Sequence, residues 1–280
     1  MPSKLQPKPT PEPERQAQPQ RQPQAQPAHL DRLSALLKGL APRVWLSDGG
    51  AGLGMHIVRP VQALGAQSLR LLVTPCGQSL SGQALRQQEL APWLSFQVAF
   101  DGPIGPLFQS QFREPLDIAL DAADPSLGQI TQLIAAEIAV PRCGHPLLMN
   151  RAGDILLIGL LRHLVASPQG SMHLFNGLAD ARMARVLVAV HTSPGKAWSL
   201  ERLAQEAGMS RTAFAQHFAR VLGMAPGRYL AQLRLAIAQK LVADGMGLKQ
   251  VARETGYAGP STLSRAMHRA GAAGATFQPA

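Results

Sequence analysis

The sequence is poor in several features that would define common classes of protein. It holds only two cysteines, Cys76 and Cys143, in 280 residues. That number excludes a disulfide framework and fits a reducing cytosol. The longest apolar run, residues 155–161, is closed by Asp154 and Arg162 and is far too short to span a bilayer. We therefore expect a cytoplasmic protein that does not enter the membrane.

Residues 1–28 lack large apolar side chains almost completely. They contain eight prolines and seven glutamines, and no apolar core follows their charges, so they are no signal peptide. Such a segment cannot bury enough surface to offset its ordering entropy. We expect a disordered arm, and we favour a passive tail over a peptide-docking role.

Acidic residues are scarce in the C-terminal third of the chain. Residues 180–280 hold 13 Lys and Arg against 5 Asp and Glu, whereas residues 29–179 hold 10 of each kind. A basic block confined to one region is typical of a phosphate-binding surface. A solvated cationic face is the alternative, and the repeat described below argues against it.

The length suits two domains, each able to bury a core. In the first, a helix is predicted around Leu30–Leu40, and strand-like runs at 55–58, 69–74 and 95–100 predict a β-rich barrel or sandwich. Ser126 is expected to cap a helix through Ala139 that buries Ile130, Leu133, Ile134 and Ile138. A helix over 147–165 is apolar nearly all round, so either a subunit interface or the monomer core buries its extra face.

A weak repeat about 48 residues apart lies inside the basic block. Its copies are Leu-Glu-Arg-Leu-Ala-Gln-Glu-Ala-Gly-Met-Ser at 200–210 and Leu-Lys-Gln-Val-Ala-Arg-Glu-Thr-Gly-Tyr at 248–257. Each reads as a short helix, a turn at glycine and a second helix. This pattern predicts two helix-turn-helix motifs, at about 200–221 and 248–269, with a longer helix from Pro226 to Ala243 between them.

The second helix of each motif is the candidate DNA-reading element. In the first motif we expect Ser210 to cap a helix over 211–222, whose apolar side chains Phe214, Phe218, Val221 and Leu222 face the core. The polar residues expected at DNA are Ser210, Arg211, Thr212, Gln216 and Arg220, because Gln pairs with adenine and Arg with guanine.

In the second motif the helix is expected to begin at Pro260, with Leu263 and Met267 inward. The residues expected at DNA there are Pro260, Ser261, Thr262, Ser264, Arg265, His268 and Arg269. Arg265 is the leading base-reading candidate, and His268 is assigned to phosphate or solvent rather than to catalysis.

The segment from Leu178 to Arg269 resembles the AraC/XylS family of bacterial transcription regulators. The matching text is Ser199–Ser210, Leu222–Pro226, Tyr229-Leu230, Arg234, Ala238, Val251-Ala252, Gly256-Tyr257 and Ser264–Ala266. The text at 178–185, 191–195 and 198 is similar to family members with a cupin-like N-terminal domain. The resemblance implies an α+β chain: a β-rich cupin-like domain with flanking helices, then an all-α domain of seven helices with two helix-turn-helix motifs that insert into successive major-groove faces.

The resemblance also implies the domains and partners. We expect a disordered arm at 1–28, a cupin-like sensor and dimerisation domain at 29–170, and a DNA-binding domain at 171–280. The expected function is a nucleoid-associated activator that binds double-stranded promoter DNA, acts with RNA polymerase, and responds to a small molecule or an oxidant, with homodimerisation through the sensor. No cofactor and no enzymatic activity are expected.

Two alternatives accompany this interpretation. A redox-responsive regulator would use Cys76 and Cys143, since Arg142 and His145 lie near Cys143 and can lower a thiol pKa by approaching it. A DNA-repair methyl acceptor fused to a similar domain needs a four-ligand zinc site, which two cysteines cannot supply. Cupin metal sites need several histidines, whereas His56 is isolated, so we expect it to be hydrogen-bonded or exposed.

The chain departs from the family pattern in two places. Gly259 stands where the family usually has serine, so no side chain is available there to cap the helix or bind phosphate. After Arg269 the sequence consists mainly of small residues. The family usually has a large apolar residue there, followed by glycine and a proline at the start of a final helix. We therefore expect the second motif to bind DNA more weakly than the first.

Overall fold

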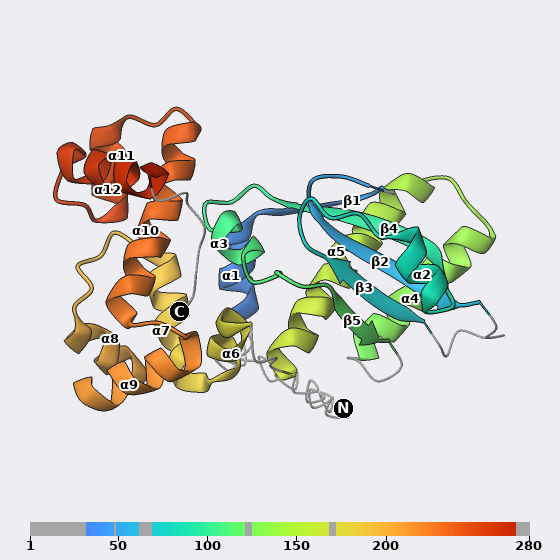
Figure 1. Cartoon of the computed structure of the whole chain (residues 1–280), viewed down its shortest axis with the longest axis horizontal. Coiled ribbons are helices and arrows are strands. Elements are labelled where there is room, and N and C mark those ends of the chain that lie inside the picture. The colour runs from blue at the N-terminus through green and yellow to red at the C-terminus, as the bar shows by residue number, and fades with distance from the viewer. Residues whose placement is uncertain (1–31, 48, 62–68, 121–124, 168–171, 273–280) are drawn as a thin grey trace, which may run out of the picture.

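The computed structural model describes residues 32–47, 49–61, 69–120, 125–167 and 172–272. Three features expected from the sequence lie outside these ranges: the arm at 1–28, the loop at 168–170 and the tail after Ala272. Figure 1 places the sheet and its helices on one side and the remaining helices on the other.

The N-terminal part contains one five-stranded antiparallel sheet. Its strands, in spatial order, are β1 (Pro42–Leu46), β4 (Leu90–Phe100), β2 (Leu53–Pro60), β3 (Arg70–Thr74) and β5 (Leu116–Ala119). The three predicted runs fall on β2, β3 and β4, the central strands. The sequence missed β1 and β5, which form the edges and carry fewer buried side chains. Where a barrel or a sandwich was expected, the described residues form a single sheet with helices packed on it.

The helices of this part are α1 (Arg32–Leu40), α2 (Gly82–Gln87), α3 (Gly105–Gln109), α4 (Pro125–Ala139) and α5 (His145–Ala166). Helix α5 packs against β1 and α4. At Gly153 a Cβ would lie 2.7 Å from Val44 and 2.8 Å from Phe96, so the absence of a side chain lets α5 approach the sheet. This close approach explains why α5 is buried along so much of its length.

Helix α4 differs in two details from its prediction. It begins at Pro125, so Ser126 lies inside the helix rather than before it. Leu127, Ile130 and Ile134 are buried and Ile138 is partly buried, whereas Leu133 is 44% exposed. The prediction grouped Leu133 with Ile134, but neighbouring helical residues are about 100° apart, and burial follows the side of Ile134.

The C-terminal part comprises seven helices among the described residues, the number that the resemblance implied. They are α6 (His173–Ala179), α7 (Ala181–Thr192), α8 (Leu200–Ala207), α9 (Arg211–Leu222), α10 (Pro226–Ala243), α11 (Leu248–Thr255) and α12 (Pro260–Ala272). The predicted bounds of α10 hold at both ends. The bounds were predictable because the sequence carries clear start and stop signals: proline begins the helix and Asp-Gly follows its end.

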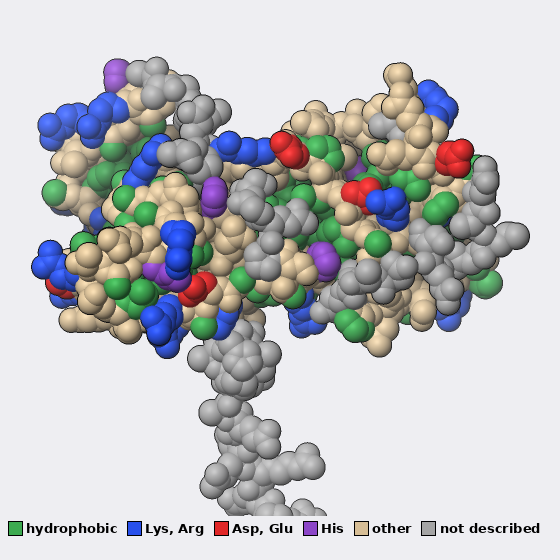
Figure 2. All heavy atoms as spheres, turned by 60° about the horizontal axis from the view of Figure 1, so that its bottom comes forward, with side chains coloured by type: hydrophobic (Ala, Val, Ile, Leu, Met, Phe, Trp, Pro, Cys, Tyr) green, Lys and Arg blue, Asp and Glu red, His purple; other side chains and the backbone are tan. Residues whose placement is uncertain are grey.

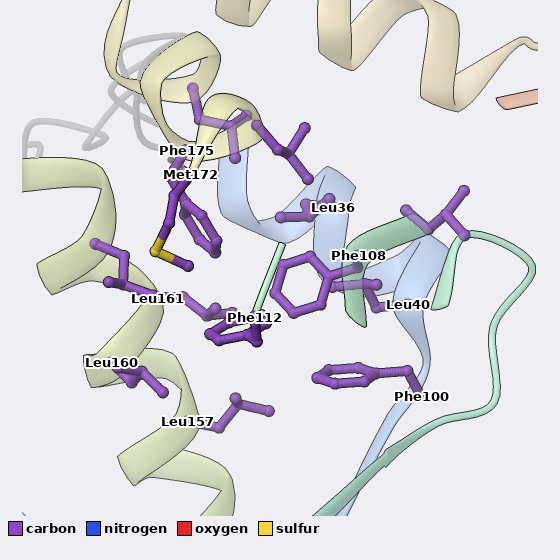
Figure 3. Close-up of a cluster of buried hydrophobic side chains, with 14 of the residues drawn as sticks. Leu36, Leu40, Phe100, Phe108, Phe112, Leu157, Leu160, Leu161, Met172 and Phe175 are labelled. Carbon is purple, nitrogen blue, oxygen red and sulfur yellow. The ribbon is translucent and has the colours of Figure 1, made fainter. Parts of the chain in front are cut away.

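The two parts share one hydrophobic core. Figure 3 shows Phe108 and Phe112 of the sheet domain facing Phe175 of α6, with α1 and α5 around them. The ring centroids of Phe108 and Phe175 lie 5.6 Å apart, and those of Phe112 and Phe175 lie 6.0 Å apart. The side-chain Oε1 of Gln111 also accepts a hydrogen bond from the buried amide of Leu174, at 3.1 Å. The hydrophobic core is therefore continuous between the sheet domain and α6 among the described residues, and the domain boundary expected at 170/171 lies outside those residues.

Candidate DNA-binding interface

The first helix-turn-helix motif is built by α8 and α9. The Ser199 hydroxyl accepts a hydrogen bond from the Arg202 amide and so caps α8. Gly208 then ends α8 at φ +63°, in the left-handed region that favours glycine. The amide of Met209 donates to the carbonyl of Ala204 at 2.9 Å, which closes the turn. Ser210 caps α9 by accepting from the Ala213 amide at 3.3 Å, as the sequence predicted.

The second motif repeats this geometry in α11 and α12. Gly256 ends α11 at φ +73°, and the Tyr257 amide donates to the carbonyl of Ala252 at 2.9 Å. The match of Gly208–Met209 with Gly256–Tyr257 confirms that the 48-residue repeat is a repeat of structure. Helix α12 begins at Pro260 as predicted, and the Leu263 amide donates to the carbonyl of Gly259.

Helix α9 has a buried face and an exposed face, as the sequence indicated. Phe214, Phe218 and Leu222 are buried, whereas Val221 is only half-buried. On the other side the predicted DNA-facing residues Ser210, Arg211, Thr212, Gln216 and Arg220 are all exposed.

Two arginines of α9 already contact other side chains of the protein. Arg211 pairs with Glu201 of α8 at 2.8 Å, and both side chains are well exposed. Arg220 lies 2.6 Å from Nδ1 of His217, whose Nε2 lies 2.6 Å from the Asp180 carboxylate at the start of α7. The exposed Arg211–Glu201 pair contributes little to stability, so a DNA phosphate can replace Glu201 as the partner of Arg211 at small cost. The sequence reasoning missed Glu201, His217 and Asp180, which only the fold brings to these arginines.

Helix α12 presents a cationic outer face. Leu263 is fully buried and Met267 partly so, as expected. A surface hollow of about 460 Å³ is lined by Thr262, Arg265, His268 and Arg269. All four were predicted at DNA, and the structure brings them together. The remaining predicted residues Pro260, Ser261 and Ser264 are exposed on the same helix.

The two motifs differ in the charge of their first helix. Glu201 in the first turn of α8 corresponds by the repeat to Lys249 in the first turn of α11, and both are exposed. Lys249 thus adds a cation beside the positive N-terminal end of a helix, a place suited to phosphate. Sequence reasoning did not single it out, although the aligned repeat carries the signal. Figure 2 shows Lys and Arg side chains gathered over the left-hand, C-terminal part of the molecule.

Comparison with known proteins agrees with this geometry. Residues 203–272 match the family profile of a helix-turn-helix domain, and residues 46–166 match that of a cupin. A putative AraC-like transcription regulator of Streptomyces lividans is 32% identical over 125 residues, which cover 44% of this chain and 41% of that protein. The chain joins an AraC-type helix-turn-helix domain to a cupin-like domain.

Other relatives of this chain are also named as regulators. The HTH-type transcriptional regulator AlkR of Acinetobacter baylyi is 29% identical over 49% of this chain and 45% of its own length. The RCS-specific activator RclR of Escherichia coli is 33% identical over 39% of each chain. The chain thus spans less than half the length of these curated relatives. A crystal structure of ToxT from Vibrio cholerae aligns over 81% of this chain and 87% of its own, with 11% identity and a TM-score of 0.33.

The residues considered for other chemistry occupy ordinary structural positions. His56 is buried, with Nδ1 at 2.9 Å from the Ser95 hydroxyl and Nε2 at 3.1 Å from that of Thr74, so it is hydrogen-bonded as expected. Within the described ranges no group of three His, Cys, Asp or Glu residues is arranged to hold a metal ion. None of the described helices is both long and apolar enough to cross a membrane.

Both cysteines are free thiols in different settings. Cys76 is half-buried, and burial raises the pKa of its thiol, which disfavours the reactive thiolate. Cys143 is exposed in the loop between α4 and α5. The neighbouring Arg142 and His145 both contact the carboxylate of buried Glu137, at 2.9 and 3.2 Å, so both side chains already have a partner other than Cys143.

Proposed function

We propose that this AraC-type chain is a sequence-specific transcription regulator that grips one duplex site with both motifs. The observation that carries the proposal is the pairing of two helices with exposed polar faces, α9 and α12, each preceded by a similar glycine turn and both within a basic block. Each helix lies at the position that enters the major groove in helix-turn-helix proteins.

Base reading is assigned to the residues nearest the start and middle of each helix. Gln216 is exposed on α9 and presents the amide geometry that pairs with adenine. Arg265 on α12 has the donor fork that matches guanine. Thr212 supplies a methyl group for thymine contact. Arg211, Arg220 and Arg269 are assigned mainly to phosphates.

The regulatory part of the proposal is that the cupin-like domain senses a signal and adjusts the DNA-binding domain at promoter DNA, activating transcription with RNA polymerase in the cytoplasm. The shared core supports this, because a change around Phe108 or Gln111 reaches α6 directly. Helix α6 in turn packs on α9, where a Cβ at Gly177 would lie 3.0 Å from Leu222. The exposed side chains Leu147 and Ile155 of α5 suit a homodimer contact.

An oxidant is the second candidate for the signal, and the exposure of Cys143 favours it. The raised pKa of Cys76 disfavours that thiol as the redox-active group. A Cys76→Ser, Cys143→Ser double variant separates the two in a reporter assay. If its response to oxidant equals that of the parent, redox sensing by these thiols is wrong.

Salt dependence tests DNA binding itself. A duplex selected from a random pool should bind the full chain with log affinity falling by about 0.9 per phosphate neutralised, for each unit of log salt. Replacing Arg269 by Gln should reduce that slope by about one phosphate. Arg70→Gln is the matched control, since Arg70 pairs with Asp117 on the sheet and should leave the slope unchanged. A chain that binds no duplex at low salt would contradict the proposal.

A further inference from the structure

The two motifs touch through the loop that precedes the first one. Residues 193–199 connect α7 to α8, and Gly195 in this loop lies against the end of α11. A Cβ at Gly195 would lie 2.4 Å from the carbonyl oxygen of Glu254. A Cβ at Gly256 would lie 2.9 Å from the carbonyl oxygen of Gly195. Two glycines therefore allow the backbone of the first motif's loop to meet the turn of the second.

Arg234 of α10 lies between the two sides of this contact: it hydrogen-bonds to the loop and packs against Gly256 of the turn. Its Nε donates to the carbonyl of Pro194 at 2.9 Å, and its Nη2 donates to the carbonyl of Lys196 at 2.8 Å. A Cβ at Gly256 would lie 2.9 Å from the same Nη2, so the guanidinium is wedged between loop and turn. The side chain is partly buried, and no carboxylate pairs with it among the described residues.

We call these contacts of Arg234 with the loop and with Gly256 the Arg234 strap. The second motif needs this additional anchor because its hydrophobic core is separate from the main core. Ala238, Val251, Ala252 and Leu263 form a cluster separate from the main core that holds the first motif. Helices α11 and α12 pack on α10, near its C-terminal end. A motif that packs on α10 at one place only can rotate or tilt relative to α10. A second anchor at the α11–α12 turn fixes the orientation of the second motif.

We propose that Arg234 is a positioning residue that sets the spacing at which the two motifs read one DNA site. The inference rests on the proposed function, since spacing matters only when both motifs bind. Two recognition helices that bind the same face of B-DNA must lie about 34 Å apart, one helical turn. Each base pair inserted between the two DNA segments that they read rotates one segment relative to the other by about 34° around the helix axis. A motif held by the Arg234 strap cannot follow that rotation. A planar two-pronged donor suits two backbone carbonyls, a geometry that lysine cannot reproduce.

The test uses the full chain and a set of duplexes. The parent site is selected from a random pool, and its two protected segments are separated by one or two inserted or deleted base pairs. We expect the parent protein to lose at least tenfold in affinity on each altered duplex. Arg234→Met should bind the altered duplexes within about threefold of the selected one. Lys240→Met, which removes a cation from the same helix but away from the loop, should keep the parent's preference.

A second variant covers the case in which Arg234→Met does not fold. Gly195→Ala leaves Arg234 in place but sets a methyl group against the Glu254 carbonyl, and it should relax spacing in the same way. If Arg234→Met and Gly195→Ala fold and keep the parent's spacing preference, the proposed positioning role of Arg234 is wrong. If Lys240→Met also binds the altered duplexes nearly as well as the selected one, the proposal is likewise wrong, because loss of a positive charge from α10 would then explain the effect. A parent that binds no duplex specifically refutes the proposed function itself, which is a distinct outcome.

Discussion

At the scale of single residues, the side chains that face outward from α9 and α12 decide specificity. Gln216→Ala and Arg265→Ala should each cost about 1–3 kcal/mol of discrimination between the selected site and random duplex, if they form paired contacts with a base. Competition binding of both duplexes measures this. Equal weakening on the two duplexes would assign the residue to phosphates instead.

The two substitutions should differ in size. Gly259 gives α12 no side-chain cap, so we expect Gln216 to matter more than Arg265. Lys249 works in the opposite direction, since it adds a cation that the first motif lacks at Glu201. A larger loss from Arg265→Ala would show that this added charge outweighs the missing cap.

A partly buried histidine gives the fold a pH dependence at the residue scale. His191 of α7 lies 2.6 Å from the Tyr229 hydroxyl, and burial lowers the pKa of His191 from 6.5 to about 4. The unfolded chain therefore binds a proton that the folded chain does not, between these values. Stability from this site is complete above pH 6.5 and is lost as the pH falls toward 4, by at most about 3 kcal/mol.

His191→Gln removes the titrating group and keeps a side chain that can hydrogen-bond to Tyr229. The difference in unfolding free energy between parent and variant should shrink or reverse as the pH falls from 7 to 4. A difference that stays constant with pH would mean that His191 is not held neutral.

At the scale of elements, the glycine turns of the two motifs form a matched pair. Gly208→Ala places a Cβ at positive φ with only ordinary contact to Arg185, and it should cost about 1 kcal/mol. Gly256→Ala adds the same backbone strain and two contacts of 2.9 Å, to Arg234 and to Gly195. Thermal unfolding should therefore show the larger loss for Gly256→Ala. Equal losses would argue against tight packing at the second turn.

The elements also show what a sequence can predict here. The motifs, α10 and the core strands β2, β3 and β4 were predictable, because caps, glycines and periodic apolar residues are local signals. The edge strands β1 and β5 and the short helices α2 and α3 were not, since contacts made elsewhere in the chain stabilise them. The exposed faces of α9 and α12 followed from their buried faces. The partners of Arg211, Arg220 and Arg234 come from other elements, and no local pattern places them.

At the scale of the whole molecule, the core that passes through α6 couples the two parts. Phe175 is distant in sequence from Phe108 and Phe112 and meets them only in the fold, so a separate sensor domain was the natural expectation. Phe175→Ala should destabilise the full chain by about 3–5 kcal/mol. It should destabilise a fragment starting at Ser171 much less, because the partner rings are then missing. Denaturant unfolding of the four proteins measures this, and equal losses would show that Phe175 serves only the C-terminal part.

The central claim is that α9 and α12 engage one site together, and hydroxyl-radical footprinting of the full chain tests it most directly. The parent should protect two segments about one helical turn apart on the same face of the duplex. Gln216→Ala should weaken protection of one segment and Arg265→Ala that of the other. A single protected segment, unchanged by either substitution, would contradict the claim.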